Sequence, residues 1–159
     1  MDLSKKQANA LVVLRILIGW HLLYEGITKL YNPAWTSKAY LVSAAGPLKG
    51  FFNWLSNDGI IGIVDNLNIF GLVIIGLALI LGFWERIAAV LGIILMLFYY
   101  LSQPPFPGVE QIGTEGNYFL VNKNLIEAAA IWVLYLFPSG QYFGIGKLFS
   151  TSSKSTSPP

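Results

Sequence analysis

The stretch that decides the fold is ANALVVLRILIGWHLLYEGITKL, residues 8–30. A membrane-spanning helix needs about 20 mostly apolar residues to cross about 30 Å of hydrocarbon, and this stretch is long enough. It nevertheless contains four ionisable residues, which are Arg15, His21, Glu25 and Lys29. With about 100° between successive residues of a helix, these four share about 160° of the circumference. The sequence therefore predicts a spanning helix with one face toward protein or water and the other toward lipid.

The composition of the whole chain indicates an integral membrane protein. Hydrophobic residues make up 55% of the 159 residues and charged residues 11%, about half the share found in soluble domains. The net charge is only +2 and the basic residues are scattered, so we expect no nucleic-acid partner. Because the chain has no cysteine and only one histidine, we expect no metal and no covalently bound cofactor. Any redox chemistry would then use a diffusible carrier such as a quinone, or a partner subunit.

The apolar segments predict an all-α fold, an integral membrane four-helix bundle in contact with the lipid bilayer. The spans are expected at about residues 8–30, 67–84, 87–101 and 119–137. We expect residues 1–149 to form a single membrane domain, and the low-complexity residues 150–159 to form a disordered tail. The positive-inside rule places both the N- and the C-terminus in the cytoplasm. The sequence thus predicts a multi-pass protein of the cell's inner (cytoplasmic) membrane.

The connection between the first two spans is unusually long, from about residue 32 to residue 66. Loops of more than about 12 to 15 residues usually carry structure or function of their own. Four apolar residues in it have the spacing of one helix face, namely Leu48, Phe51, Phe52 and Leu55. They predict a short amphipathic helix at about residues 47–56. This helix is expected either to lie at the membrane interface, with Trp54 as an anchor, or to form a lid over a cavity.

The fourth span carries charges that match those of the first. Lys123 and Glu127 lie about 40° apart on one helix face. At a rise of about 1.5 Å per residue, antiparallel packing brings His21 and Glu127 to one depth, and Glu25 and Lys123 to another. We therefore predict the pairs His21–Glu127 and Glu25–Lys123, in the outer half of the membrane.

These residues predict a polar pocket between the first and fourth spans, able to bind a quinone head group or an oxyanion and to move protons. Histidine ordinarily titrates near neutral pH, and together with two carboxylates it gives the catalytic candidates His21, Glu25 and Glu127. The candidates for binding the substrate or quinone are Arg15, Lys29, Lys123, Asn124, Trp20, Tyr24 and Trp132. Arg15 lies nearer the cytoplasmic side, where Glu85 or Tyr135 is its expected partner. The alternative is that the buried charges are internal salt bridges that only fix helix register.

Several stretches resemble the DoxX family of small four-helix membrane proteins. They are LRILIGWHLLYEGITKLYNPAW, GPLKGFFNWL, IFGLVIIGLALILGFWERIAA, YYLSQPPFPG and EGNYFLVNKNLIEAAA. The resemblance covers roughly residues 11–147, and the chain looks closest to the DoxD type, the membrane subunit of thiosulfate:quinone oxidoreductase. It implies electron transfer from a reduced substrate, thiosulfate in the DoxD case, into membrane quinone, usually with a second subunit. It supplies no catalytic motif.

Three functions are therefore compared. The first is a subunit of a quinone-linked oxidoreductase, which the polar pocket and the DoxD-like stretches favour. The second is a non-catalytic membrane scaffold or assembly factor, in which the charged cluster is only architecture. The third is a small permease, for which four spans are few unless a homo-oligomer supplies more.

Overall fold

The computed structural model describes residues 3–107 and 117–145, so the tail expected at 150–159 lies outside the described residues. The elements in chain order are α1 (Lys5–Leu30), α2 (Lys38–Val42), α3 (Lys49–Leu55), α4 (Ile61–Leu81), α5 (Glu85–Ser102), β1 (Asn117–Tyr118), β2 (Val121–Asn122) and α6 (Lys123–Leu136). The two short strands pair in an antiparallel hairpin. The described part of the chain is thus mostly helical, as expected.

Three of the described helices are long and apolar enough to cross a membrane, namely α1, α4 and α5. They correspond to the first three expected spans. The helix α6 has 14 residues and is therefore about 21 Å long, less than the hydrocarbon thickness of about 30 Å. The described residues thus contain three candidate membrane spans.

Local backbone chemistry explains where the helices begin and end. Ser4 and Gln7 form a capping box that starts α1 three residues earlier than expected. Gly82, at φ 65°, ends α4 in the left-handed region three residues before the expected end. The expected start of the last span at Phe119 is wrong. Residues 117–122 form the hairpin instead, and the side chain of Asn122 caps α6 by accepting a hydrogen bond from the backbone of Leu125.

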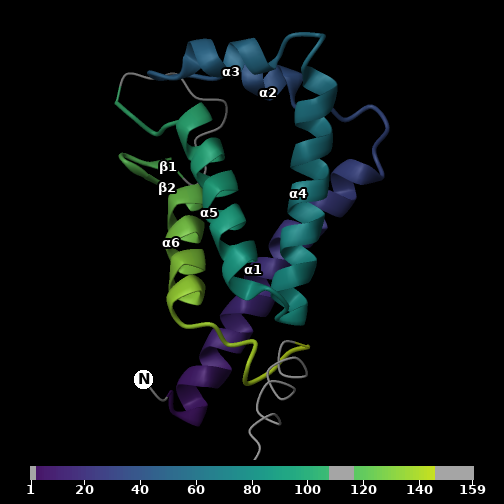
Figure 1. Ribbon diagram of the computed structural model, residues 1–159. Helices are drawn as coiled ribbons and strands as arrows, with labels where there is room; N and C mark the ends of the chain where they lie inside the picture. Colours follow the sequence, from purple (N-terminus) through teal and green to yellow (C-terminus); the bar gives the residue numbers. More distant parts are fainter. Residues whose placement is uncertain (1–2, 108–116, 146–159) are drawn as a thin grey trace, which may run out of the picture.

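The four longer helices pack side by side, with α1 leaning across the others (Figure 1). The helix α1 lies along α4, while α5 contacts both α4 and α6. One apolar core joins them, formed by Ile18, Leu22, Leu72, Ile75, Leu79, Ala88, Ala89, Met96, Ala128, Ile131 and Leu134. The first described residues of α1 and the segment that follows α6 lie at the same end of the molecule, beside the turn between α4 and α5 (Figure 1).

Close contact between α1 and α4 depends on glycine. A Cβ atom on Gly76 would lie 2.6 Å from the backbone nitrogen of Leu23 and 2.7 Å from the carbonyl oxygen of Gly19. No side chain fits there without separating the two helices. Small residues that allow backbones to approach are typical of helix interfaces in membranes.

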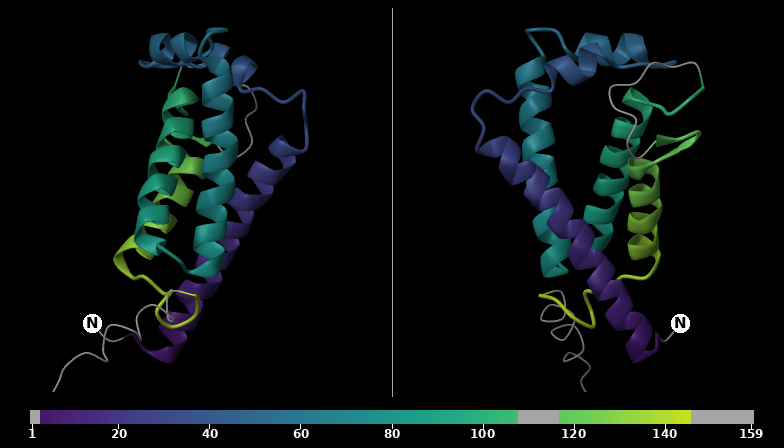
Figure 2. Two further views of the ribbon diagram at one scale, coloured as in Figure 1. Left: turned by 45° about the vertical axis from the view of Figure 1, so that its right-hand side comes forward. Right: turned by 180° about the vertical axis from the view of Figure 1, so that it is seen from behind.

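Residues 32–60, which we call the roof, cover the opposite end of the molecule, and the helices α2 and α3 of the roof lie across the long helices (Figure 2). The helix α3 falls within the expected range 47–56. Phe52 is buried beside Leu41 and Ala44 in a small second core, whereas Trp54 is exposed. A short helix in the expected range is therefore confirmed. Of its expected apolar face, Phe52 and Leu55 pack into this core, whereas Leu48 and Phe51 are exposed.

Candidate functional site

A pocket of about 290 Å³ lies beneath the roof, and we call it the roof pocket. The helices α1, α4, α5 and α6 supply its walls, and residues 35–37 with Tyr40 supply its cover. Six of the ten expected site residues line it, namely His21, Glu25, Lys29, Lys123, Asn124 and Glu127. Two carboxylates, two ammonium groups and one imidazole thus face the same small volume.

One polar contact in the roof pocket joins α1 to α6. The Nδ1 atom of His21 lies 2.8 Å from Oε1 of Glu127. The side chain of His21 is 49% exposed and that of Glu127 is 13% exposed. This confirms the predicted His21–Glu127 pair, and it places a proton-carrying group and a carboxylate within one hydrogen bond of each other.

The ammonium group of Lys29, which also lines the pocket, is surrounded by polar and aromatic side chains. Its ammonium nitrogen lies 3.6 Å from a carboxylate oxygen of Glu25 and donates a hydrogen bond of 3.3 Å to the side-chain oxygen of Asn68. The same nitrogen lies 5.1 Å from the ring centre of Trp35 and 5.7 Å from that of Tyr99, both within cation–π range. The predicted Glu25–Lys123 ion pair is therefore wrong. Glu25 pairs instead with a residue one turn further along its own helix.

Lys123 and Asn124 lie in the first turn of α6, where both line the pocket. The hairpin of β1 and β2 positions this turn, because Asn122 ends the second strand and caps the helix. The side chain of Lys123 is exposed, so it brings a positive charge to the pocket's edge. Helix N-termini carry partial positive charge as well, which makes this edge suited to an anionic or electron-rich group.

The aromatic residues expected to wall the pocket lie elsewhere. Trp20 and Tyr24 on α1 are 60% and 58% exposed, Trp132 on α6 is 57% exposed, and none of the three lines the pocket. They lie on the outer surface of α1 and α6, away from the pocket. The aromatic walls are instead Trp35, Tyr40 and Tyr99. Burial raises the pKa of the Tyr40 phenol above its ordinary 10.0, because the charged form would be poorly solvated there.

Hydrogen bonds hold the roof over the pocket. Asp65 on α4 accepts two bonds from Ser37, one from its backbone nitrogen at 2.9 Å and one from its hydroxyl at 2.5 Å. The phenol of Tyr40 donates to the backbone oxygen of Tyr99 at 3.2 Å and accepts from the hydroxyl of Ser102 at 2.6 Å. The cover of the pocket is thus fastened to α4 and α5.

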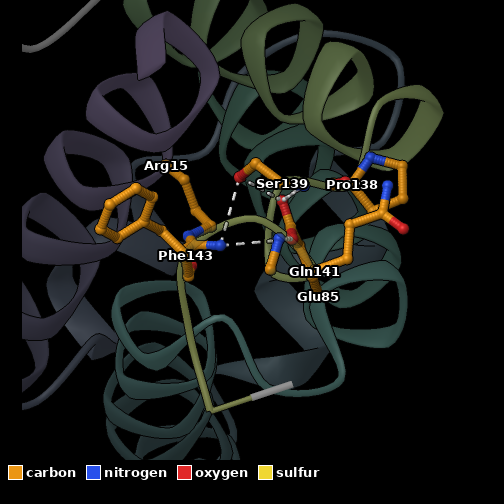
Figure 3. Close-up of polar contacts among 7 residues, drawn as sticks. Arg15, Glu85, Pro138, Ser139, Gln141 and Phe143 are labelled. Carbon is orange, nitrogen blue, oxygen red and sulfur yellow. Dashed lines mark hydrogen bonds and ion pairs between the residues drawn. The ribbon is translucent and has the colours of Figure 1, made fainter. Parts of the chain in front are cut away.

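A second polar cluster lies at the other end of the molecule, and we call it the Arg15 cluster (Figure 3). The Arg15 guanidinium lies 3.5 Å from the Glu85 carboxylate and donates to the Ser139 hydroxyl at 3.2 Å and to the Phe143 carbonyl at 2.6 Å. Glu85 also accepts bonds from the backbone nitrogens of Ser139, at 3.1 Å, and Gly140, at 2.6 Å. Glu85 was one of the two expected partners of Arg15, and this pair is confirmed. Arg15 does not line the roof pocket, so its expected role in binding is not supported.

Sequence reasoning missed several residues of the roof pocket. Asn68 was placed at the very start of the second span, yet α4 begins at Ile61 and carries this amide well inside the helix. A polar residue inside an apolar helix was the available signal. Trp35 and Tyr40 lie in the roof, where no periodicity indicates which side chains turn inward. Across residues 3–107 and 117–145, no cluster of three or more carboxylates and imidazoles is placed to hold a metal ion.

Comparison with known proteins places this architecture in a family. A family model described as DoxX matches residues 10–103, which is more than half of the chain and contains nearly all of α1 to α5. No curated protein and no solved structure matched the chain. The match, together with three apolar helices, identifies a membrane protein, and the chain belongs to the DoxX family.

Proposed function

We propose that this protein is a membrane subunit of a quinone-linked oxidoreductase, and that the roof pocket binds the quinone head group. In this proposal the protein lies in the cytoplasmic membrane with both termini in the cytoplasm. The helix α6, together with the residues on either side of it, completes a fourth crossing. The roof then lies on the outer face of the membrane, where it is accessible to an electron donor on that side.

The observation that carries the proposal is the hydrogen bond of 2.8 Å between His21 and Glu127 inside a pocket of small-molecule size. Reduction of a quinone to a quinol takes up two electrons and two protons. An imidazole hydrogen-bonded to a carboxylate is able to deliver a proton and recover another, because the two groups can pass a proton across the bond that joins them. Five ionisable side chains around one pocket are more than helix register requires.

Other pocket residues are suited to hold the ring in place. Lys29 is fixed by Glu25 and Asn68, so its positive charge is directed at one position beside the ring of Tyr99. Lys123 brings a second positive charge from the first turn of α6. Positive groups at fixed positions stabilise the negative charge that develops on a quinone oxygen during reduction.

The electrons come from a reduced sulfur substrate in this proposal, with thiosulfate as the candidate donor. Two thiosulfate ions release two electrons when a sulfur–sulfur bond forms between them to give tetrathionate, which balances the two electrons that a quinone accepts. The donor reaction takes place either at the roof or on a second subunit. The resemblance of several stretches to the DoxD type and the polar pocket support this assignment.

The test is quinone reduction by the purified protein in proteoliposomes, with thiosulfate as donor, alone and with any subunit that co-purifies. We expect the Glu127→Gln variant to reduce quinone about a hundredfold more slowly or worse, because removal of a proton-transfer group typically costs that much. Asp58→Asn is the matched control, since it makes the same carboxylate-to-amide change at an exposed site outside the pocket.

Two results would contradict the proposal. Wild-type protein that is folded and yet reduces no quinone, with or without its co-purified subunit, would remove the oxidoreductase assignment. Glu127→Gln protein that loses thermal stability but keeps full activity would assign the pair to architecture. The second result would favour the scaffold or assembly role that the sequence also allows.

A further inference from the structure

We infer that the molecule bound in the roof pocket carries a hydrocarbon tail and enters sideways from the lipid, between α1 and α6, and that the His21–Glu127 bond closes this entrance. The inference rests on the proposed function and adds to it the class of substrate and its route. Five observations support it: the size of the pocket, the position of its exposed residues, the attachment of the roof, the weak junction between α1 and α6, and the apolar surface beside that junction.

The roof pocket is too small for a complete lipid-soluble molecule. Its volume of about 290 Å³ lies at the low end of the range of about 300 to 1,000 Å³ for small-molecule sites. One substituted ring fits into this volume, but a ring with a long tail does not. A tailed ligand must therefore leave its tail outside the pocket, and the tail needs an opening.

The exposed charged residues of the pocket lie on α1 and α6. The side chains of His21 and Glu25 are half exposed and Lys123 is exposed. On the opposite wall, by contrast, Leu72 of α4 and Met96 of α5 are fully buried. The charged side chains of the pocket are therefore most accessible on the side of α1 and α6, and the wall toward α4 and α5 is buried.

The route from the water side is covered by the roof. Ser37 is bonded twice to Asp65 of α4, and Tyr40 is bonded to the backbone of Tyr99 and the hydroxyl of Ser102 on α5. Lifting the roof away from the pocket would break these bonds together. The side facing α1 and α6 has no comparable cover among the described residues.

Of the four junctions between neighbouring long helices, the one between α1 and α6 has the least contact. The helix α1 lies along α4, and the views agree that its upper half leans away from α6 toward the roof (Figures 1 and 2). Among the described residues, the His21–Glu127 contact is the single side-chain hydrogen bond between the two helices. When these two groups part to exchange protons with a ligand, the same movement opens the gap.

The surface beside this gap is apolar, as a hydrocarbon tail requires. Leu17 and Tyr24 on α1 and Ile126 on α6 are all more than half exposed. Tyr24 lies three residues after His21, and Ile126 directly precedes Glu127, so both lie near the level of the closing bond. A tail leaving the pocket here would run along these side chains and into the bilayer.

A cross-link across the gap tests this route. Because the chain has no native cysteine, the reagent links only the two cysteines that are introduced. The double variant Tyr24→Cys/Ile126→Cys is linked with a short bis-methanethiosulfonate reagent. The control is Phe70→Cys/Leu97→Cys with the same reagent. These two exposed residues lie on α4 and α5 near the level of the Asn68–Tyr99 bond.

Binding is followed by quenching of the fluorescence of Trp35, which lines the pocket, and the Trp35→Phe variant identifies this signal among the five tryptophans. Two quinones with the same ring are compared in vesicles, one with a long isoprenoid tail and one with only methyl groups. The cross-link across α1 and α6 should weaken binding of the tailed quinone by about tenfold or more, because contacts of a few methylene groups are lost. Equilibrium binding of the tail-less quinone should be unchanged.

The outcomes separate the inference from the proposed function. If the cross-linked protein binds the tailed quinone as tightly as the uncross-linked double variant does, the lateral route is wrong while quinone binding stands. Equal weakening by the control cross-link at α4 and α5 would also overturn the lateral route. If neither quinone quenches Trp35 in the wild-type protein, the proposed function fails, and the inference fails with it.

Discussion

Replacing Glu85 by glutamine should destabilise the protein strongly, because this carboxylate is the centre of the Arg15 cluster. One of its oxygens accepts from the backbone and hydroxyl of Ser139, and the other accepts from Gly140 and faces Arg15. Glutamine keeps only one acceptor oxygen. Its amide group would therefore point hydrogens at one of these two sets of donors, and Arg15 would lose its counter-charge.

The size of the expected loss of stability follows from the burial of the two side chains and from the distance between their charged atoms. Arg15 and Glu85 are both almost completely buried, and their charged atoms lie 3.5 Å apart. At an effective dielectric constant of about 20, unit charges at this separation attract by about 5 kcal/mol. Breaking a buried pair while one charge stays behind typically costs about 3 to 5 kcal/mol. For a chain of this length, that loss would lower the melting temperature by about 6 to 20 °C.

The assay is a double-mutant cycle with Glu85→Gln, Arg15→Gln and the double variant, measured by thermal and denaturant unfolding in detergent. We expect the double variant to lose less stability than the two single losses together, by about 2 kcal/mol or more, since neither charge is then left alone. The control is Lys38→Gln with Asp58→Gln, an exposed pair on the roof. Losses at Arg15 and Glu85 that simply add would refute the reasoning, because they would show that the two charges do not interact.

Two further predictions concern packing and pH. Gly76→Ala should destabilise the protein by about 1 to 3 kcal/mol in unfolding experiments, since its Cβ would lie 2.6 Å from the Leu23 nitrogen. Gly71→Ala, where a Cβ meets nothing within 4 Å, should leave the stability unchanged or raise it slightly. Hydrogen bonding to Lys38 lowers the pKa of the Asp58 carboxyl below its ordinary 3.8. The stabilisation from this pair is therefore present at neutral pH and lost as the pH falls through the lowered pKa, and a carbon-13 titration of Asp58 should move back toward 3.8 in Lys38→Ala protein.

Helical periodicity predicted one of the two expected contacts between α1 and α6 correctly, His21–Glu127, and failed for Glu25–Lys123. A fixed rise and a fixed turn per residue place His21 at the level of Glu127 once two helices run antiparallel. The same reasoning left Arg15 without a partner in the pocket and named Glu85 as one of two candidates. An ionisable side chain in an apolar helix needs a polar partner at its own depth in the membrane, so only a few residues of the chain can be that partner.

The rest of the pocket could not be predicted, because its residues follow no period. Trp35 and Tyr40 are placed by the hydrogen bonds of the roof to α4 and α5, which exist only in the folded chain. Aromatic rings on membrane helices gave a misleading signal. Trp20 and Trp132 suit a lipid-facing surface as well as a cavity wall, and periodicity does not distinguish the two environments.

The Arg15 cluster also sets an order for biosynthesis. Arg15 precedes Glu85 by 70 residues and Ser139 by 124, so the donors that complete the carboxylate's hydrogen bonds leave the ribosome late. Until the segment after α6 arrives, Glu85 lacks its bonds from Ser139 and Gly140 and has Arg15 as its partner within the cluster. An incomplete chain therefore exposes an undersatisfied charge to the membrane-insertion machinery. The charge is fully satisfied only when the segment after α6 has folded back onto Glu85.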